Sequence, residues 1–309
     1  MNTPVWIRAK ERGNTLGIAI VVAVLKLFGY KTALFMLYFI VFYFYLTGKK
    51  SRGFSLQYLN NLNDFNPDAH SKPVFFDGYR HFLAFAVNAL DRMWLWNKNG
   101  DGFTFDIDGH ELILEHLKDG RGCLFMGAHA GNFDALRVLS KKLDVTVNVI
   151  GYAHNARKFE DMQKRINPHS RVNFIDVKEG DPAWIIQLQE MINRGEIVAM
   201  MGDRFVPGSR SRVCEISFLG KNAPFPENPW IVAGLLDCPV FFVTGLRKKD
   251  MRYSCIARLI DNKIVLHRKT RSQDIKKYAQ KYAILLESIC KDYPYQWFNF
   301  YDFWKLDNK

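Results

Sequence analysis

The residues best suited to chemistry in this sequence are His129 and Asp134, which follow an apolar run and have four residues between them. The run over 123–127 predicts a buried strand, and the small residues after it predict a turn into a helix over 132–141. A carboxylate about one turn into that helix can reach back to the imidazole, fix its tautomer and leave the other nitrogen to take a proton. The pattern therefore predicts that His129 is a general base oriented by Asp134.

Gly131 and Asn132 lie in the same turn and are candidate substrate-binding residues. A glycine lets the backbone approach a substrate closely, and the first N–H groups of a helix bind anionic oxygens. We expect the backbone amides near these two residues to stabilise the oxyanion of an acyl-transfer intermediate.

The spacing of His129 and Asp134 is a weak motif by itself, because chance alone accounts for such a pair in a chain with eight histidines. His110 and Glu115 have the same spacing, but both fall within one predicted helix over 110–117. Five residues at about 100° each place those two side chains roughly 140° apart, so they face different directions. The alternative for His129 is a structural histidine whose hydrogen bonds are satisfied inside the fold.

Asp203 and Arg204 form a second polar feature, directly after a predicted buried strand over 197–201. The planar guanidinium of Arg204 suits a phosphate, pantetheine or head-group oxygen, and Asp203 could hold that arginine or orient a hydroxyl. Both residues are therefore candidates for substrate binding. The alternative is an ion pair with a purely structural role at the surface.

The cysteines do not form a metal-binding or catalytic pattern. They stand apart from one another in apolar surroundings, which is typical of reduced core thiols in a cytosolic protein: Cys123, Cys214, Cys238, Cys255 and Cys290. No cysteine or serine is placed to form an acyl-enzyme, and a thioester substrate needs none because it is already activated. We expect no metal and no cofactor.

Strand and helix signals alternate after residue 102. Apolar runs predict strands over 103–107, 123–127, 145–150, 172–177, 197–201, 239–246 and 253–260. Periodic apolar residues predict helices over 78–96, 110–117, 132–141, 157–166, 181–193 and 274–290, with Asp181 and Pro182 as the start of one of them. Prolines over 224–229 predict a rigid turn into an apolar helix. The alternation predicts an α/β fold with a mixed, largely parallel sheet flanked by helices.

The first 55 residues differ in character from the rest of the chain. Residues 16–46 are strongly apolar, but Lys26 and a turn signal at 29–31 divide them into pieces shorter than the roughly 20 residues of a membrane span. Basic residues flank both ends, which favours two helices that lie in the membrane interface with both flanks on the cytoplasmic side. A single span and a buried helix of a soluble protein are the alternatives. We expect a membrane-associating segment over 1–55, a linker over 60–73 and one α/β domain over 56–309.

The formal net charge of +12 fits an anionic partner, which could be a nucleic acid, an anionic membrane or an acidic protein. The basic residues are scattered and no nucleic-acid recognition motif is present, so we expect no nucleic-acid partner. The aromatic content of 15% is concentrated near the two ends, as is typical of proteins that contact a membrane interface.

Four motifs in this order resemble the lipid A biosynthesis (late) acyltransferases of the lysophospholipid acyltransferase superfamily. They are residues 129–134, 202–204, 218–220 and 225–229, with the sequences HAGNFD, GDR, FLG and FPENP. The opening WIRAKERGNTLG and closing QWFNFYDFW sequences look more like a subgroup of predicted acyltransferases associated with aryl polyene pigment clusters. Together these similarities extend over nearly the whole chain.

The resemblance implies a catalytic dyad of His129 and Asp134, substrate binding by Asp203 and Arg204, and a location on the cytoplasmic face of the inner membrane. It implies transfer of a fatty acyl group from acyl carrier protein, or from acyl-CoA, to a hydroxyl of a lipid or glycolipid. Ala128 departs from the family, whose lipid A enzymes often carry Asn before the histidine, and this weakens the assignment of lipid A itself as the acceptor. The alternative function is a non-catalytic, basic, membrane-bound lipid-binding protein with a degenerate site.

Overall fold

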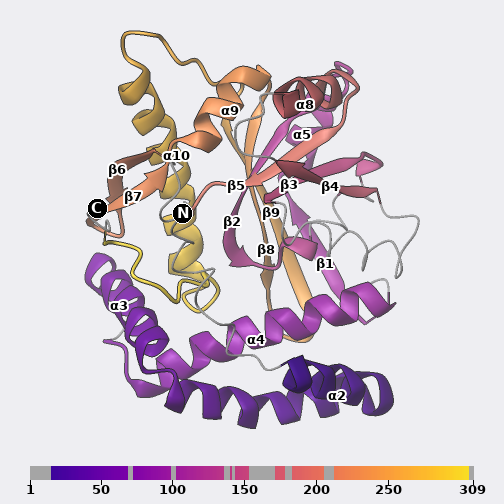
Figure 1. The fold of residues 1–309 in the computed structure, drawn as a ribbon, viewed down its shortest axis with the longest axis vertical. Helices are drawn as coiled ribbons and strands as arrows, with labels where there is room; N and C mark the ends of the chain where they lie inside the picture. Colours follow the sequence, from indigo (N-terminus) through magenta and orange to yellow (C-terminus); the bar gives the residue numbers. More distant parts are fainter. Residues whose placement is uncertain are drawn as a thin grey trace.

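The computed structural model describes residues 15–68, 72–98, 102–135, 140, 143–152, 171–177, 183–204 and 212–305. Its centre is a seven-stranded sheet with the strand order β1-β9-β8-β2-β5-β3-β4 (Figure 1). The strands are β1 (Thr104–Asp108), β2 (Leu124–Gly131), β3 (Val147–Tyr152), β4 (Val172–Val177), β5 (Ile197–Met201), β8 (Val240–Arg247) and β9 (Arg252–Asp261). Strands β8, β2, β5, β3 and β4 are parallel, whereas β9 and β1 run the opposite way. The predicted mixed, largely parallel α/β sheet is confirmed.

Helices cover both faces of this sheet. One face packs against α8 (Ala183–Asn193), α9 (Asn228–Leu236) and α10 (Arg271–Asp292), and the other packs against α5 (His110–Leu117). The side chains of β2 alternate between the two cores, because Leu124 and Met126 face the first and Phe125 faces the second. Strand β2 is therefore central and buried on both sides, as its continuous apolar sequence predicts.

A separate hairpin of β6 (Val213–Phe218) and β7 (Lys221–Pro226) lies beside α10. Leu219 and Gly220 form its turn, both with positive φ, at 51° and 72°. The expectation of a rigid turn over 224–229 is wrong in part, because Pro224 and Pro226 belong to β7, and the apolar helix that follows is α9. A two-stranded hairpin leaves one edge of each strand unpaired, so it tolerates residues that lack an N–H.

Two helices, α2 (Thr15–Thr47) and α4 (Phe75–Lys98), lie across the end of the sheet where β2, β5 and β8 terminate (Figure 1). Between them in the chain, α3 (Lys49–Phe65) lies to one side, near the β6, β7 hairpin, and packs into the main core. Helix α4 contacts the sheet, and α2 packs lengthwise along α4. Helix α2 is interrupted at Gly29, whose φ of 79° and ψ of 179° are not helical, so the predicted break in the apolar segment is confirmed.

The predicted linker over 60–73 is wrong in its first part, since α3 continues to Phe65. Tyr58, Leu59 and Leu62 form a buried stripe at helical spacing, and this packing outweighs the polar asparagines between them. The expected boundary between residues 55 and 56 falls inside α3. The helix expected over 157–166 and the helix start at 181–182 lie outside the described residues.

Candidate active site

His129 lies within strand β2, which continues to Gly131 instead of ending at Gly127 as expected. The pairing of β2 with β8 shifts register between Gly127 and Gly131, so this last part of the strand is irregular. A short C-terminal segment, residues 296–298, runs alongside it. Phe298 N–H donates to the His129 carbonyl at 2.8 Å, and Ala130 forms an antiparallel bridge with Trp297. The backbone of His129 is thus held between two neighbouring segments.

Asp203 is the hydrogen-bond partner of the His129 ring. The distance from His129 Nδ1 to Asp203 Oδ1 is 2.7 Å, and the His129 backbone N–H donates to Asp203 Oδ2 at 2.8 Å. The sheet register explains this contact, because Gly127 of β2 pairs with Met201 of β5, and the two residues lie two positions beyond that pair. The side chain of His129 is 34% exposed, whereas Asp203 is completely buried.

The surroundings of Asp203 keep it ionised. Burial alone raises the pKa of this carboxyl group, but the charge and hydrogen bonds of His129 and the charge of Arg204 outweigh burial and lower the pKa to about 2. Trp297 Nε1 also donates to Asp203 Oδ2, at 3.1 Å. A carboxylate only accepts hydrogen bonds, so Nδ1 of a neutral His129 carries the proton and Nε2 is the nitrogen with a free lone pair.

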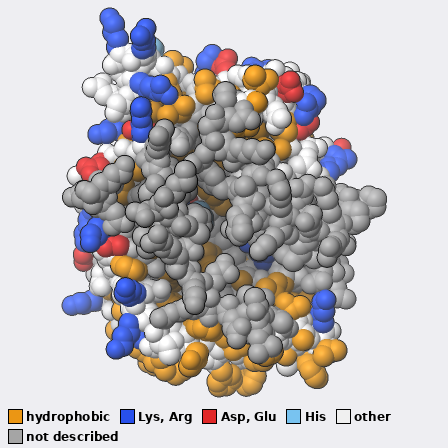
Figure 2. All heavy atoms as spheres, in the orientation of Figure 1, with side chains coloured by type: hydrophobic (Ala, Val, Ile, Leu, Met, Phe, Trp, Pro, Cys, Tyr) orange, Lys and Arg blue, Asp and Glu red, His pale blue; other side chains and the backbone are white. Residues whose placement is uncertain are grey.

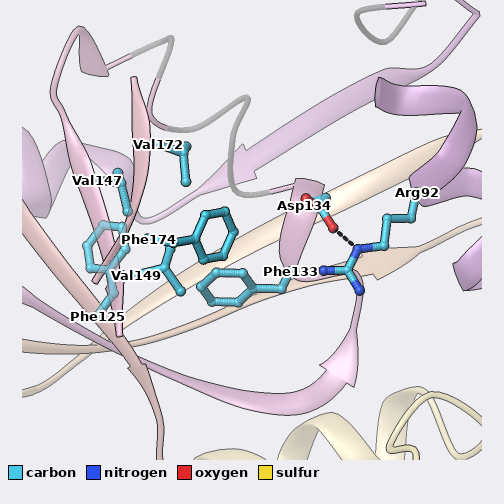
Figure 3. Close-up of a pocket in the computed structure, with 8 residues that line it drawn as sticks. All are labelled: Arg92, Phe125, Phe133, Asp134, Val147, Val149, Val172 and Phe174. Carbon is cyan, nitrogen blue, oxygen red and sulfur yellow. Dashed lines mark ion pairs between the residues drawn. The ribbon is translucent and has the colours of Figure 1, made fainter. Parts of the chain in front are cut away.

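Asp134 lies beyond the end of β2, on the short turn Phe133–Ala135, and its carboxylate forms an ion pair with the Arg92 side chain of α4 (Figure 3). The helix expected over 132–141 is described only in part, and Phe133–Ala135 forms a 3-10 turn. Because β2 runs on through Gly131, the sharp turn expected directly after His129 is absent from this described part of the chain. The carboxylate paired with His129 Nδ1 is therefore Asp203, while Asp134 connects the site to α4.

The backbone amides of Gly131 and Asn132 are engaged within the fold. Gly131 N–H donates to the Gln296 carbonyl at 2.8 Å, and Asn132 N–H donates to the Gly245 carbonyl at 2.6 Å. The expectation that these amides bind an oxyanion is therefore wrong in this structure, since neither hydrogen is free. Gly131 has a φ of 67° and packs directly on the backbone of Gly245, which leaves no room for a side chain.

The side chain of Asn132 is also buried in structural contacts. Its Oδ1 accepts from the Asp134 backbone N–H at 3.0 Å, and its Nδ2 donates to the Tyr253 hydroxyl at 3.3 Å. Asn132 thus fixes the turn that carries Asp134.

Arg204 lies next to Asp203 and reaches the same C-terminal segment. Its guanidinium donates to the Phe298 carbonyl and lies over the Tyr301 ring, 5.3 Å from the ring centre. Phe298 is also the residue that donates to the His129 carbonyl. The four charged or titratable side chains of the site, His129, Asp134, Asp203 and Arg204, are thus fixed by strand ends, by α4 and by residues 296–301.

An apolar pocket borders the Asp134 turn. Its lining is Arg92, Phe125, Phe133, Asp134, Val147, Val149, Val172 and Phe174 (Figure 3). The Phe133 and Phe174 rings lie beside one another in it, and the ion pair of Arg92 and Asp134 lies at one end (Figure 3). The free volume of about 30 Å³ is enough for one or two water molecules, so in this structure the pocket is too small for a hydrocarbon chain.

In a comparison with protein families, the model described as bacterial lipid A biosynthesis acyltransferase matches residues 9–306. The chain belongs to this family. No curated protein matches it. Members of the lipid A biosynthesis acyltransferase family transfer acyl groups to lipids, and acyl transfer is therefore the chemistry that the site has to support.

In this member of the acyltransferase family, several residues of the site were not predicted from the sequence. Arg92 on α4 pairs with Asp134, and Asp91, also on α4, is completely buried. Asp91 accepts hydrogen bonds from Arg247 Nε at 2.7 Å, from the Tyr253 hydroxyl at 2.6 Å and from the Tyr30 hydroxyl. The adjacent Asp91 and Arg92, which interrupt the mostly apolar stretch over 82–96, were the signal in the sequence, because charges on a buried face are retained only with partners.

All five cysteines are free and buried, which confirms the prediction of core thiols. Burial raises the pKa of the Cys214 thiol to about 11 and that of Cys255 to about 12. These thiols stay protonated at neutral pH and are poor nucleophiles. Among the described residues, no group of three His, Cys, Asp or Glu side chains is arranged to hold a metal ion.

Proposed function

We propose that this protein is an O-acyltransferase in which His129 acts as general base on a hydroxyl of a lipid or glycolipid. The hydrogen bond between His129 Nδ1 and the buried Asp203 carboxylate carries the proposal, because it fixes the tautomer that a general base requires. His129 lies near the carboxyl end of β2, and Asp203 lies just beyond the carboxyl end of the adjacent parallel strand β5, the edge at which open α/β sheets bind ligands.

The reaction follows from this tautomer. Nε2 of His129 removes the proton of the acceptor hydroxyl while the oxygen attacks the carbonyl carbon of the acyl thioester. The tetrahedral intermediate collapses, the carbon–sulfur bond breaks, and the thiolate leaves and takes the proton from the imidazolium. An ester and a free thiol result. Positioned proton transfer of this kind is worth about 10²–10⁴-fold in rate.

The oxyanion of that intermediate needs a donor other than the amides of Gly131 and Asn132. We assign this role to the guanidinium of Arg204, which is held beside Asp203 by the Phe298 carbonyl. Arg92 is the second cation of the site, and its ion pair with Asp134 suits it better to holding the turn and the polar end of a substrate.

The acceptor reaches the site from a membrane surface. Large apolar side chains are exposed on α2, on the first half of α4 and at Val74 just before α4. They are Ile20, Leu27, Phe28, Phe35, Tyr38, Phe39, Phe42, Tyr43, Leu46, Val74, Phe75, Phe76 and Phe85. We call this set the apolar face. Figure 2 shows hydrophobic side chains gathered along the lower edge of the molecule, where Figure 1 places α2. Large exposed apolar patches mark sites of contact with membranes or with other proteins.

The packing of α2 favours a helix that lies on the membrane over one that crosses it. Among the described residues, Ile20–Thr47 is the helix with the length and hydropathy of a membrane span. Its inward residues, from Leu25 to Tyr45, pack along α4, and Gly29 breaks it. An interfacial position at the cytoplasmic face of the inner membrane brings the lipid to the end of the sheet that carries His129.

The donor is an acyl thioester, and we propose acyl carrier protein, with acyl-CoA as the other candidate. For the acceptor, the opening and closing sequences still predict the aryl polyene-associated subgroup, and Ala128 still argues against lipid A itself.

The experiment that tests the proposed function compares the lipids of cells that produce the wild-type protein with those of cells that produce His129→Ala at the same level. Mass spectrometry should find a lipid that is heavier by one acyl group only with the wild-type protein. Identical lipid profiles, with the wild-type protein present in the membrane fraction, would support the non-catalytic lipid-binding alternative.

A further inference from the structure

The C-terminal segment of residues 296–298 lies beside the last residues of β2. It pairs with residues 129–131 through two backbone hydrogen bonds and the bridge between Ala130 and Trp297. The side chain of Gln296 fastens the segment to β8, because its Oε1 accepts from the Arg247 N–H at 2.9 Å and its Nε2 donates to the Arg247 carbonyl at 2.7 Å. The segment is therefore a fixed part of the sheet end.

Trp297 points from this segment into the site. Its indole is 1% exposed and packs against the rings of Tyr58, Phe218 and Phe303, with ring centres 4.9, 5.1 and 5.0 Å away. These contacts leave the ring no room to turn. Its Nε1–H donates to Asp203 Oδ2 at 3.1 Å, so an unbroken chain of hydrogen bonds runs from Trp297 through Asp203 to His129.

The two oxygens of Asp203 have different partners. Oδ2 accepts both the Trp297 indole N–H and the His129 backbone N–H, whereas Oδ1 accepts from the His129 ring. Two donors on Oδ2 fix the rotation of the carboxylate and leave Oδ1 to the imidazole. Without the indole donor, the backbone N–H alone would hold Oδ2, and the carboxylate plane would be free to tilt away from Nδ1.

We propose that Trp297 is a positioning residue of the acyl-transfer reaction, and that residues 296–298 complete the catalytic centre by fixing the Asp203 carboxylate against His129. This inference rests on the proposed function, because positioning matters only if His129 is the base. Trp297 touches neither reacting group and acts through Asp203.

Trp297→Phe tests the inference, since it keeps an aromatic ring in the cluster and removes only the N–H donor and part of the ring volume. We expect kcat to fall about tenfold, equivalent to about 1.4 kcal/mol in the activation barrier, with the KM for the donor unchanged. The assay follows label from the palmitoyl thioester of acyl carrier protein into total lipid of the producing cells. The matched control is Trp304→Phe. Trp304 belongs to the same aromatic cluster, but its indole N–H donates to the Phe218 carbonyl and not to Asp203.

A double-mutant cycle separates positioning from a merely structural role. If Trp297 acts through Asp203, adding Trp297→Phe to Asp203→Asn should cost almost no further activity. Wild-type kcat in Trp297→Phe, an equal loss in Trp304→Phe, or additive losses in the double variant would each overturn the inference. Full activity in His129→Ala would instead refute the proposed function, so the two failures are distinguishable.

Discussion

At the scale of single residues, the geometry at His129 depends on partners that come from two other parts of the chain. Asp203 follows β5, Trp297 lies near the C-terminus, and Phe298 binds the His129 carbonyl. Each of them fixes a different atom of the site. The buried, ionised Asp203 carboxylate is stabilised by three N–H donors, two from His129 and one from Trp297, and this fixed geometry also makes it an effective partner for an imidazolium.

The first prediction compares the two carboxylates of the site. Asp203→Asn should lower kcat by about 10²-fold or more, because the amide no longer stabilises an imidazolium and is able to hold the wrong tautomer. Asp134→Asn should cost less, since Asp134 pairs with Arg92 and its loss changes the turn instead of the base. Steady-state rates of both purified variants, with His110→Ala as a histidine control, provide the comparison. A larger loss in Asp134→Asn would restore the dyad that the sequence spacing predicts.

The sequence identified His129, Asp203 and Arg204 because each follows an apolar strand. It could not show that β2 and β5 are neighbours, and only that neighbourhood places Asp203 beside the imidazole. Because strand order was unknown, the sequence favoured Asp134, the carboxylate close to His129 along the chain. Hydrogen bonds between residues 74 positions apart depend on strand order, which local pattern does not encode.

At the scale of elements, His81 joins α4 to α3 and to the C-terminal segment. Its Nε2 lies 2.8 Å from the Trp297 carbonyl, and its Nδ1 lies 2.8 Å from the Ser55 hydroxyl. A carbonyl only accepts, so Nε2 of His81 carries a proton. Burial lowers the pKa of His81 from 6.5 to about 4, and the hydrogen bond to Trp297 offsets this only in part.

The second prediction follows from that pKa. Between pH 6.5 and 4 the unfolded chain binds a proton at His81 that the folded protein does not, so the free energy of unfolding falls as the pH falls through this window. The loss due to His81 should reach about 3 kcal/mol at pH 4 and below. Urea unfolding in detergent at a series of pH values measures it. His81→Gln should flatten this part of the curve, and equal curves for wild type and His81→Gln would contradict the assignment.

The third prediction concerns the apolar face on α2. Phe35 and Phe39 are 66% and 64% exposed, and their rings contact each other. Burial of one phenylalanine in a membrane is worth about 1.5–3 kcal/mol, so Phe35→Glu or Phe39→Glu should weaken binding to anionic vesicles by roughly tenfold or more. Ile284→Glu is the control, because Ile284 is similarly exposed but lies on α10. Unchanged sedimentation of the Phe variants with vesicles, or an equal loss in the control, would show that the membrane contacts another surface.

Helices and strands with a regular pattern of apolar residues were predictable, whereas elements that form through tertiary packing against their local propensity were not. The helix over 110–117 and the strands over 172–177 and 197–201 were predicted to the residue. The β6, β7 hairpin was missed because Pro224 and Pro226 argue locally against a strand. The start of the expected linker proved helical, because the burial of Tyr58 and Leu62 outweighs the low helix propensity of Asn60 and Asn61.

At the scale of the whole molecule, α4 lies between the apolar face on α2 and the strand ends that carry the site. Helix α4 contacts α2 on one side and supplies Asp91 and Arg92 to the strand ends on the other. Under the proposed function, this arrangement would bring a lipid of the membrane to the end of the sheet that carries His129. At the end of β8, Arg247 pairs with the buried Asp91 and belongs to the core, whereas Lys249, two residues later, is exposed.

The fourth prediction concerns the donor. Lys248→Glu with Lys249→Glu should lower kcat/KM for an acyl carrier protein thioester, and rising salt should do the same, since salt screens such charges over about 10 Å at 0.1 M. The acyl-CoA thioester should respond less to either change. Arg247 is left intact, because breaking its pair with Asp91 would destabilise the fold, and Lys269→Glu is the control. Equal salt dependence for the two donors would remove the case for a carrier protein.

The central claim is that this chain transfers an acyl group with His129 as the base. The most direct test measures turnover by the purified wild-type protein and by purified His129→Ala in detergent. The donors are labelled acyl thioesters of acyl carrier protein and of CoA, and the acceptor is total lipid of the producing cells. We predict label in lipid with the wild-type protein and a loss of about 10²–10⁴-fold in His129→Ala, with the same unfolding midpoint. Wild-type turnover in His129→Ala, or no turnover by a folded wild-type protein with either donor, would contradict it.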